Sequence, residues 1–525
     1  MVNISEMISR TFGEYRFLPG LTPAGLKTTD IDLSTQLTKD TKEKKGIRLN
    51  IPVMSAAMQS VTGVDMAIAL AQQGGLGVVY CSQTIEDQAM MVKSVKRARA
   101  GFASQLEIVN PDDSIEDVMR IIEQTGYNVI PVVEGTKKDY DKLLGVFEGP
   151  VPDSIPKDDP VKKWMKEFRH ESLGSIVNYH LSANDPADKI IRIVSDYLHY
   201  AENDNDAEHD TSLEDANKIM TDNRLKYLTL INPDGTLKFM VFRKDLQAHR
   251  DFPNAVVDEK KRYLVGAAVN THDHHERVPA LIDAGVDVLF IDASDGHTAY
   301  QKECLEFIKR DFDIPVIAGN VITQDAFKYL FKSDIDGIKV GMGGGSICIT
   351  QEQKGTGRGQ ATATLEVARI RDAYASNYKE YIPIICDGGL GKAKDIALAL
   401  TFGADSVMMG RYFAGCHESP PEIQEKNGQM VKEYWGEGSL RAKEWSGKRY
   451  GQTDFDEGVP ATVPYTGRVA DNVAETFAKV RATMVSQGAK DINELRKSVI
   501  ELISEESRRE GGVHDVDEIS RSKSR

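Results

Sequence analysis

The sequence predicts an α/β protein whose main part is a closed (β/α)8 TIM barrel. Eight short apolar runs end in small or polar residues, and segments of helical periodicity lie between most of them. Strands that are apolar on both faces and alternate with helices indicate a parallel sheet, and a closed barrel requires eight strands. The runs are IPVMSA (51–56), GLGVVY (75–80), YLVGAAV (263–269), VDVLFIDAS (286–294), IPVIAGN (314–320), DGIKVGM (336–342), IPIICDGG (382–389) and ADSVMMG (404–410).

The segments between these runs have the apolar spacing of amphipathic helices. Examples are Val64–Gln73, Glu276–Ala284, Gln324–Lys332, Thr364–Tyr374 and Ala393–Phe402. A further observation favours a barrel over an open sheet, because distinctive residues stand at the C-terminal ends of strands, the face that carries catalysis in such barrels. These residues are Ser55, Asp292, Asn320, Gly341, Asp387 and Gly410.

The chain departs from the barrel pattern in three places. Residues 11–50 are polar and turn-rich and are interpreted as an N-terminal arm. The pattern breaks again between the second and third strands. We therefore expect the arm and first part of the barrel in 1–105, an insert in 106–250, and the rest of the barrel in 251–525, which ends in a flap (about 432–460) and a tail.

The insert contains two weakly similar rounds of helix and strand. VNPDDSIEDVMRII in the first corresponds to LSANDPADKIIRIV in the second. The expected elements are a helix at 114–124 and strands at 129–133 and 143–147, then a helix at 187–198 and strands at 227–231 and 237–242. This arrangement suggests an internally repeated ligand-sensing module. The acidic stretch 202–210 within it is typical of an exposed loop.

The region after the eighth strand has an unusual composition. Residues 432–450, KEYWGEGSLRAKEWSGKRY, are rich in Gly, Trp and charge and show no clear periodicity. Two Trp and two Tyr argue against plain disorder and favour a functional flap. A terminal helix is expected around 469–487, followed by a polar tail.

Composition narrows the class of protein. A net charge of −15 and a pI near 5.3 disfavour nucleic acid as a partner, because binding a duplex requires excess Lys and Arg. Apolar runs stay below the ~20 residues of a membrane helix, and the N-terminus shows no secretory signal. Five scattered cysteines indicate a reducing compartment, which predicts a cytoplasmic protein. His272, His274 and His275 lie close in sequence, but nothing completes a zinc pattern, so a solvated loop is the better interpretation.

The stretch Gly341–Thr350, GMGGGSICIT, is the strongest candidate for a reaction centre. Four glycines in five positions leave the backbone free to approach a ligand closely, and Cys348 follows directly. A thiol held by such a loop can serve as a nucleophile. On this stretch alone the alternative stays open that the glycines make a tight turn and Cys348 is a small buried apolar residue.

The motifs taken together resemble those of the inosine-5′-monophosphate (IMP) dehydrogenase family over essentially the whole chain. The similar segments are GMGGGSICIT, MSAAM (54–58), DGG (387–389), MMGRYFA (408–414), YWGEGS (434–439), KRYG (448–451) and EGGVHD (510–515). The resemblance implies NAD-dependent oxidation of IMP to xanthosine 5′-monophosphate, the first committed step of guanine nucleotide synthesis. The insert would be the family's paired CBS domains (a Bateman module), a site where a regulatory nucleotide is expected.

The resemblance also implies roles for particular residues. Cys348 would attack carbon 2 of the purine, and Arg449 would activate water for hydrolysis with help from Thr350 and Tyr450. The nucleotide would be bound by Ser346, Asp387, Gly388, Gly389, Gly410, Arg411, Tyr434, Trp435, Gly436, Glu437, Gly438 and Glu457. NAD would be bound by Asp292, Asn320, Gly341, Met342 and Gly343; the absence of a GxGxxG motif fits a barrel site.

A monovalent cation and a homotetramer are implied in the same way. Backbone carbonyls suit a hard cation such as K⁺. The expected ligands are Gly343, Gly345 and Cys348 together with Glu510, Gly511 and Gly512 from a neighbouring subunit.

Two other functions remain as alternatives at this stage. The related GMP reductase shares a barrel and a similar cysteine loop, but the resemblance implies that it lacks the CBS insert and the KRY segment. A catalytically silent nucleotide sensor is the second alternative, against which the Cys348, Thr350 and Arg449 set argues.

Overall fold

The computed structural model describes most of the 525-residue chain. The described residues are 8–98, 107–125, 128–134, 143–152, 154–167, 227–231, 237–242, 251–259, 261–439, 442 and 458–512. They divide into two compact units, the first formed by residues 1–92 with 265–525 and the second by residues 93–264.

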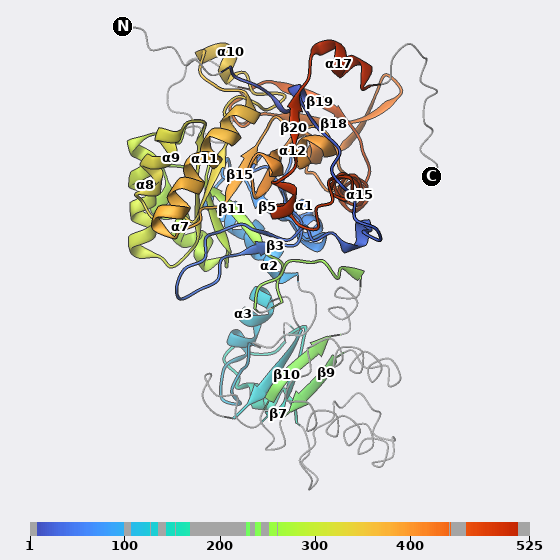
Figure 1. Cartoon of the computed structure of the whole chain (residues 1–525). Helices are drawn as coiled ribbons and strands as arrows, with labels where there is room; N and C mark the ends of the chain where they lie inside the picture. Colours follow the sequence, from blue (N-terminus) through green and yellow to red (C-terminus); the bar gives the residue numbers. More distant parts are fainter. Residues whose placement is uncertain are drawn as a thin grey trace. The chain divides into compact units, whose positions relative to one another are not determined.

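The first unit is built on a closed barrel of eight parallel strands, which confirms the predicted fold class (Figure 1). The barrel runs in the order β4 (Val53–Ser55), β5 (Leu76–Val79), β11 (Val265–Val269), β12 (Val288–Ile291), β13 (Val316–Val321), β14 (Gly337–Val340), β15 (Ile384–Asp387) and β16 (Ser406–Met409), which pairs back with β4. Seven strands fall within the apolar runs, and β13 extends one residue beyond its run. Nearly every strand residue is buried, as expected for strands covered on both faces.

Helices between the strands form the outer layer of the barrel (Figure 1). They are α1 (Val64–Gln72), α2 (Ile85–Arg97), α7 (His274–Asp283), α8 (Ala299–Asp311), α9 (Gln324–Phe331), α11 (Gln360–Tyr378) and α12 (Ala393–Thr401), with the short α10 (Thr350–Lys354) and α13 (Arg411–Ala414). The local sequence fixes where some of them begin. The Thr298 and Thr323 hydroxyls accept hydrogen bonds from backbone N–H groups of the first turns of α8 and α9.

The N-terminal arm packs across one end of the barrel. It contains η1 (Phe12–Glu14), β1 (Tyr15–Phe17), η2 (Thr28–Asp30), β2 (Thr35–Gln36) and β3 (Arg48–Leu49). Thr35 Oγ1 donates to Asp405 O at 2.7 Å, and Lys39 N donates to Asp336 O at 2.7 Å. Because Asp336 and Asp405 directly precede β14 and β16, the arm covers the N-terminal ends of the barrel strands.

The flap region has a regular framework that the sequence did not predict. A three-stranded antiparallel sheet is formed by β17 (Ile423–Lys426), β18 (Gln429–Trp435) and β19 (Pro460–Pro464). The sequence showed no clear periodicity from 432 onward, yet Lys432–Trp435 form the end of a strand and pair with 460–463. The glycine and charged residues of this segment gave no sign of β18, because this strand depends on its pairing with β17 and β19.

The C-terminal part of the chain returns to the N-terminal arm. Helix α15 spans Val469–Gln487, as predicted, and α16 (Ile492–Leu495), β20 (Ile500–Leu502) and α17 (Glu505–Glu510) follow. Strand β20 pairs antiparallel with β1. The two ends of the described chain are thereby joined in one small sheet.

The second unit contains α3 (Ile115–Thr125), β6 (Val129–Val133), β7 (Leu143–Glu148), η3 (Val161–Lys163) and β8 (Lys166–Glu167), and the hairpin β9 (Tyr227–Ile231) and β10 (Leu237–Phe242). Strands β6, β7 and β8 form an antiparallel sheet. Its apolar core includes Val118, Ile130 and Val146. Helix α3 and strands β6, β7, β9 and β10 agree with the expected elements to within about a residue, whereas η3 and β8 were not predicted. The expected helix 187–198 and the acidic stretch 202–210 lie outside the described residues.

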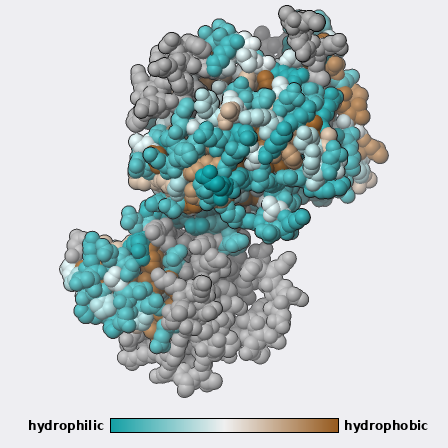
Figure 2. All heavy atoms as spheres, turned by 90° about the vertical axis from the view of Figure 1, so that its left-hand side faces the viewer, coloured by the Kyte–Doolittle hydropathy of each residue, from teal (hydrophilic) through white to brown (hydrophobic). Residues whose placement is uncertain are grey.

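Figure 2 shows the side of the molecule that carries α7, α8 and α9, where the outer surface of the barrel unit is mostly hydrophilic. Such a surface is expected where amphipathic helices turn their apolar sides toward the strands. Among the described residues no helix is both long and apolar enough to cross a membrane.

Candidate active site

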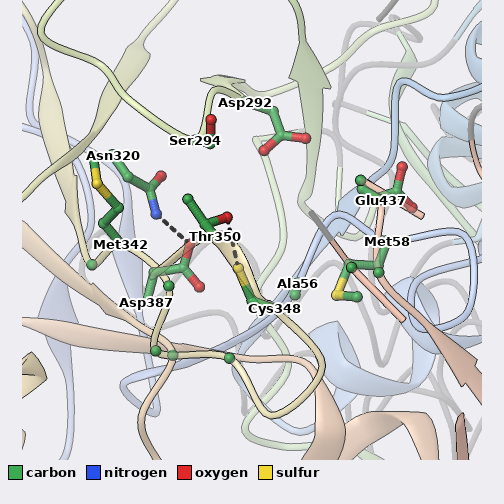
Figure 3. Close-up of a pocket in the computed structure, with 18 of the residues that line it drawn as sticks. Ala56, Met58, Asp292, Ser294, Asn320, Met342, Cys348, Thr350, Asp387 and Glu437 are labelled. Atoms are coloured by element: carbon green, nitrogen blue, oxygen red, sulfur yellow. Dashed lines mark hydrogen bonds between the residues drawn. The ribbon is translucent and has the colours of Figure 1, made fainter. Parts of the chain in front are cut away.

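A cavity opens at the C-terminal ends of the barrel strands, and most of the predicted site residues line it (Figure 3). Its wall includes Asp292, Asn320, Gly341, Met342, Gly343, Gly345, Cys348, Thr350, Asp387, Gly388, Tyr434, Gly436, Glu437 and Gly438. They come from five separate segments of the sequence, each a strand end or the loop that follows it. The barrel brings them together because parallel strands end at the same edge.

Cys348 is the cysteine that lines this cavity. Its Sγ lies 3.2 Å from Thr350 Oγ1, and its side chain is partly exposed. Burial raises the pKa of Cys304 and of Cys386 to about 12, and that of Cys416 to about 11, so these three remain neutral thiols. Since Cys81 is also buried, Cys348 is the thiol best placed to act as a nucleophile.

The glycine loop around Cys348 approaches the loop after β15 closely. Gly341 has φ +147°, and a Cβ atom there would lie 2.1 Å from the carbonyl oxygen of Asp387, so a larger residue cannot fit. Gly389 N donates to Gly344 O at 3.1 Å. On the far side, Val459 N donates to Ile347 O at 3.1 Å. The loop is therefore held between the β15 end and the segment that leads into β19.

Asp387 lies beside Cys348 in the view of Figure 3. Its Oδ2 accepts from Asn320 Nδ2 at 3.0 Å and from Lys339 Nζ at 3.0 Å. Lys339 is buried on β14 and also lines the cavity. Asp387 and Asn320 were predicted from the sequence, but Lys339 was not; its signal is a charged residue in an otherwise apolar strand.

The wall formed by β12 and β13 carries the residues predicted to bind NAD. Asp292 directly follows β12, and Figure 3 shows it beside Ser294 and above Thr350. The Asn320 Oδ1 atom is buried and has no hydrogen-bond partner among the described residues. A buried acceptor without a partner at a cavity wall fits a ligand that donates a hydrogen bond there.

Tyr434 marks the side of the cavity near β16. Burial raises its pKa to about 12, and a hydrogen bond with the Ser346 side chain opposes this rise. Gly410 lies so close that a Cβ atom would be 2.8 Å from Tyr434 Oη, and the charge of Arg411 also acts on the hydroxyl. Ser346, Gly410 and Arg411 thus gather around one neutral phenol that can donate a hydrogen bond.

Glu437 lies at the opposite side of the cavity from Asp387. Its carboxylate accepts from Gln59 N at 2.6 Å and from the Ser82 hydroxyl. Burial raises the pKa of this carboxyl to about 7, although both hydrogen bonds oppose the rise. Trp435, the last residue of β18, donates from its indole N–H to Gln59 Oε1 at 3.0 Å, so it supports this wall without lining the cavity.

The carbonyls predicted to bind a cation lie in two places. Gly343, Gly345 and Cys348 belong to the glycine loop, whereas Glu510, Gly511 and Gly512 stand at the end of α17. There the chain packs against the N-terminal arm, where Arg16 Nη2 donates to Ser507 O at 2.9 Å. No hydrogen bond among the described residues of this one chain joins the end of α17 to the glycine loop.

Three predicted residues, Arg449, Tyr450 and Glu457, lie outside the described residues. Apolar and small residues of the cavity wall were not predicted either, because they belong to no motif that indicates chemistry. They include Ala56, Ala57, Met58, Phe290, Ala293, Ser294, Ile347 and Met408.

The fold and the site define a (β/α)8-barrel enzyme with a cysteine loop at its catalytic face. A family model described as "IMP dehydrogenase / GMP reductase domain" matches residues 9–514. The chain belongs to the IMP dehydrogenase and GMP reductase family.

Several curated relatives are named inosine-5′-monophosphate dehydrogenase. The protein from Tritrichomonas foetus is 41% identical over 514 residues, which cover 96% of each chain. The protein from Aquifex aeolicus is 35% identical and covers 93% of this chain and 92% of its own. That from Methanocaldococcus jannaschii is 32% identical, with 96% and 95% covered.

A solved structure of GMP reductase from Trypanosoma brucei in complex with guanosine 5′-monophosphate is also similar. It matches with a TM-score of 0.72 and 26% identity, and the match covers 98% of this chain and 99% of that chain. The expectation that an insert distinguishes the two activities is therefore wrong, because this reductase matches along nearly the full length.

Proposed function

We propose that this chain oxidises IMP to xanthosine 5′-monophosphate, with NAD⁺ as the hydride acceptor, as part of guanine nucleotide synthesis. The observation that carries the proposal is the position of Cys348 at the cavity wall, 3.2 Å from the Thr350 hydroxyl and beside Asp387 in the view of Figure 3. The names of relatives up to 41% identical over 96% of the chain support dehydrogenase over reductase chemistry.

In this mechanism Cys348 supplies a thiolate that adds to carbon 2 of the purine. The hydride on that carbon leaves with the electron pair, and water then replaces the sulfur to release the product and the thiol. Overall, IMP, NAD⁺ and water give xanthosine monophosphate, NADH and a proton. Arg449 would activate the water, with Thr350 and Tyr450 assisting; a guanidinium is an unusual base because it normally stays protonated.

The described residues offer groups for each part of the nucleotide. Asp387 supplies a carboxylate for the ribose hydroxyls, while the Tyr434 phenol and Ser346 hydroxyl supply donors for the phosphate. Arg411 supplies one positive charge near the phenol. Gly388, Gly389, Gly410, Gly436, Glu437 and Gly438, with Trp435 behind them and Glu457 near the base, would complete the binding site.

Asp292, Asn320 and Gly341–Gly343 are the residues that would bind NAD. The buried Asn320 Oδ1 supports this assignment, since it lacks a partner among the described residues. The hydride acceptor is the chemistry that the cofactor supplies. The protein's part is to hold the substrate carbon beside this wall and exclude water until the flap moves.

A K⁺ ion and the assembly belong to the same proposal. Gly343, Gly345 and Cys348 offer carbonyls from the glycine loop, and Glu510, Gly511 and Gly512 of a second copy would complete the ring in a homotetramer. The second unit would be a paired CBS module that binds a regulatory nucleotide. We place the enzyme in the cytoplasm.

The test is an assay of NADH formation from IMP and NAD⁺ in the presence of K⁺. We expect Cys348→Ala to lower the rate at least about 1,000-fold, because removing a nucleophile abolishes the covalent route. Mass spectrometry of the wild type under turnover should detect a purine adduct on Cys348.

Cys304→Ala is the matched control, since this buried thiol on α8 lies outside the cavity and its loss should leave the rate nearly unchanged. A burst of NADH from Cys348→Ala would contradict the thiolate role. NADPH consumption with GMP, without NADH formation from IMP, would instead favour GMP reductase activity, which is the activity in the name of the similar solved structure.

A further inference from the structure

Lys339 is a buried cation in the wall of the cavity. It lies on β14, two residues before the glycine loop, and is 4% exposed. Its ammonium group pairs with Asp387, with Nζ 3.0 Å from Oδ2. Among the described charged side chains that line the cavity, Asp292, Asp387 and Glu437 are acidic and Lys339 is the basic one.

The ion pair helps to fix the orientation of the Asp387 carboxylate. Lys339 Nζ and Asn320 Nδ2 both donate to Oδ2, each at 3.0 Å. Oδ1 has no hydrogen-bond partner among the described residues, and Figure 3 shows it turned away from Asn320 toward Cys348. Two donors on one oxygen fix the rotation of the carboxylate and leave the other oxygen for a ligand.

Charge explains why a lysine is needed there. A charged donor makes a stronger hydrogen bond to a carboxylate than a neutral amide does, so the ammonium group holds Oδ2 more firmly than an amide alone would. Asn320 can orient Asp387 but brings no charge. Lys339 does both, and it does so from a strand, which holds its position more rigidly than a loop would.

We propose that Lys339 is the positioning residue for ribose recognition: it holds the Asp387 carboxylate rotated so that Oδ1 accepts from the ribose hydroxyls. This rests on the proposed function insofar as the substrate is a ribonucleotide, and it adds to that function a residue that acts through Asp387. Lys339 itself does not contact the reacting atoms.

The test compares the binding of two probes, IMP and its 2′,3′-dideoxy analogue, by calorimetric titration without NAD⁺. The wild type should bind IMP about 10- to 100-fold more tightly, as expected for hydrogen bonds to a charged acceptor. In Lys339→Met this preference should fall to within about threefold. Asp387→Asn should lose the preference equally, and the double variant should lose no more, because residues that act as a unit are not additive.

Two further variants separate positioning from simple stability. Lys339→Arg keeps the charge and should retain part of the preference for IMP. Lys309→Met removes another ion pair, that of Lys309 with Asp336 at 2.6 Å, at the other end of the barrel. It should lower the thermal midpoint while leaving the ratio of the two dissociation constants unchanged.

A folded Lys339→Met variant with the wild-type ratio would overturn the inference. So would an Asp387→Asn variant that keeps the ratio, which decides the matter even if Lys339→Met does not fold. A wild type that binds IMP with the expected preference but forms no NADH would instead overturn the proposed function and leave the role of Lys339 standing.

Discussion

The Glu437 carboxyl shows how burial sets the protonation of a single residue in this protein. It is surrounded by hydrogen-bond donors from Gln59 and Ser82, yet its pKa is raised to about 7, because removal from water costs the charged form more than two hydrogen bonds return. The side chain links the segment after β18 to the ends of β4 and β5. Its charge state therefore bears on the stability of one cavity wall.

We expect the Glu437→Gln variant to become more stable than the wild type as the pH rises. The carboxyl of the folded wild type binds its proton more tightly than that of the unfolded chain, whose pKa is near 4.5. The contribution of Glu437 to the free energy of unfolding is therefore fully present below pH 4.5 and is lost as the pH rises through about 7. The loss approaches about 3 kcal/mol. Urea unfolding of both proteins at pH 5 and pH 8 measures it.

Glu425→Gln provides the control, because Glu425 is exposed on β17. Its difference from the wild type should be the same at both pH values. If the Glu437→Gln difference were also constant with pH, the carboxyl would be ionised throughout and the raised pKa would be wrong.

At the scale of elements, the end of helix α15 determines how closely this helix packs against the N-terminal arm. Helix α15 ends at Gly488, which has φ +68° and donates to Met484 O and Val485 O. A Cβ atom at this position would lie 2.1 Å from Leu21 O in the N-terminal arm. Glycine is required twice here, by the left-handed conformation and by the close approach of another backbone.

We predict that Gly488→Ala destabilises the barrel unit more than Gly428→Ala does. Both positions have positive φ, which costs an L-residue about 1–2 kcal/mol, but no atom lies within 4 Å of a Cβ at Gly428. The clash with Leu21 O adds to the cost at Gly488 because a backbone atom cannot move aside cheaply. Equal thermal midpoints for the two variants would show that the arm shifts freely.

At the scale of the whole barrel unit, Asp405 joins segments from several parts of the chain. It precedes β16 and accepts from Arg371 Nη1 at 3.0 Å, Arg496 Nη2 at 2.8 Å and Tyr381 Oη at 2.7 Å. Its backbone oxygen accepts from Thr35 in the N-terminal arm. This buried network closes the end of the barrel opposite the cavity, which is where stability and not chemistry is expected to reside.

Asp405→Asn should lower the free energy of unfolding by about 3 kcal/mol, because it removes the negative charge that the buried Arg371 and the partly exposed Arg496 share. Denaturant titration measures the loss, and nucleotide binding should change little in the folded fraction. Asp325→Asn, which removes an exposed pair with Lys328, should cost under about 0.5 kcal/mol. A similar cost for both variants would contradict the role given to the network.

Much of the fold could be predicted from the sequence, because its signals are local. The eight apolar runs locate the eight barrel strands to within a residue, and the helix expected at 469–487 has those bounds. Strand β18 was missed because its pairing with β17 and β19 depends on residues distant in sequence. Arg449, Tyr450 and Glu457 lie outside the described residues, so their roles stay predictions.

The sequence by itself determined the barrel, the catalytic face and the cysteine loop, since periodicity and strand-end residues follow from neighbouring positions in the chain. The tertiary structure alone decided that Lys339 pairs with Asp387, that Glu437 lies among Gln59 and Ser82, and that the N-terminal arm closes the barrel. The physical reason is that charge pairing and burial depend on distances across the barrel, which residues far apart in sequence acquire only on folding.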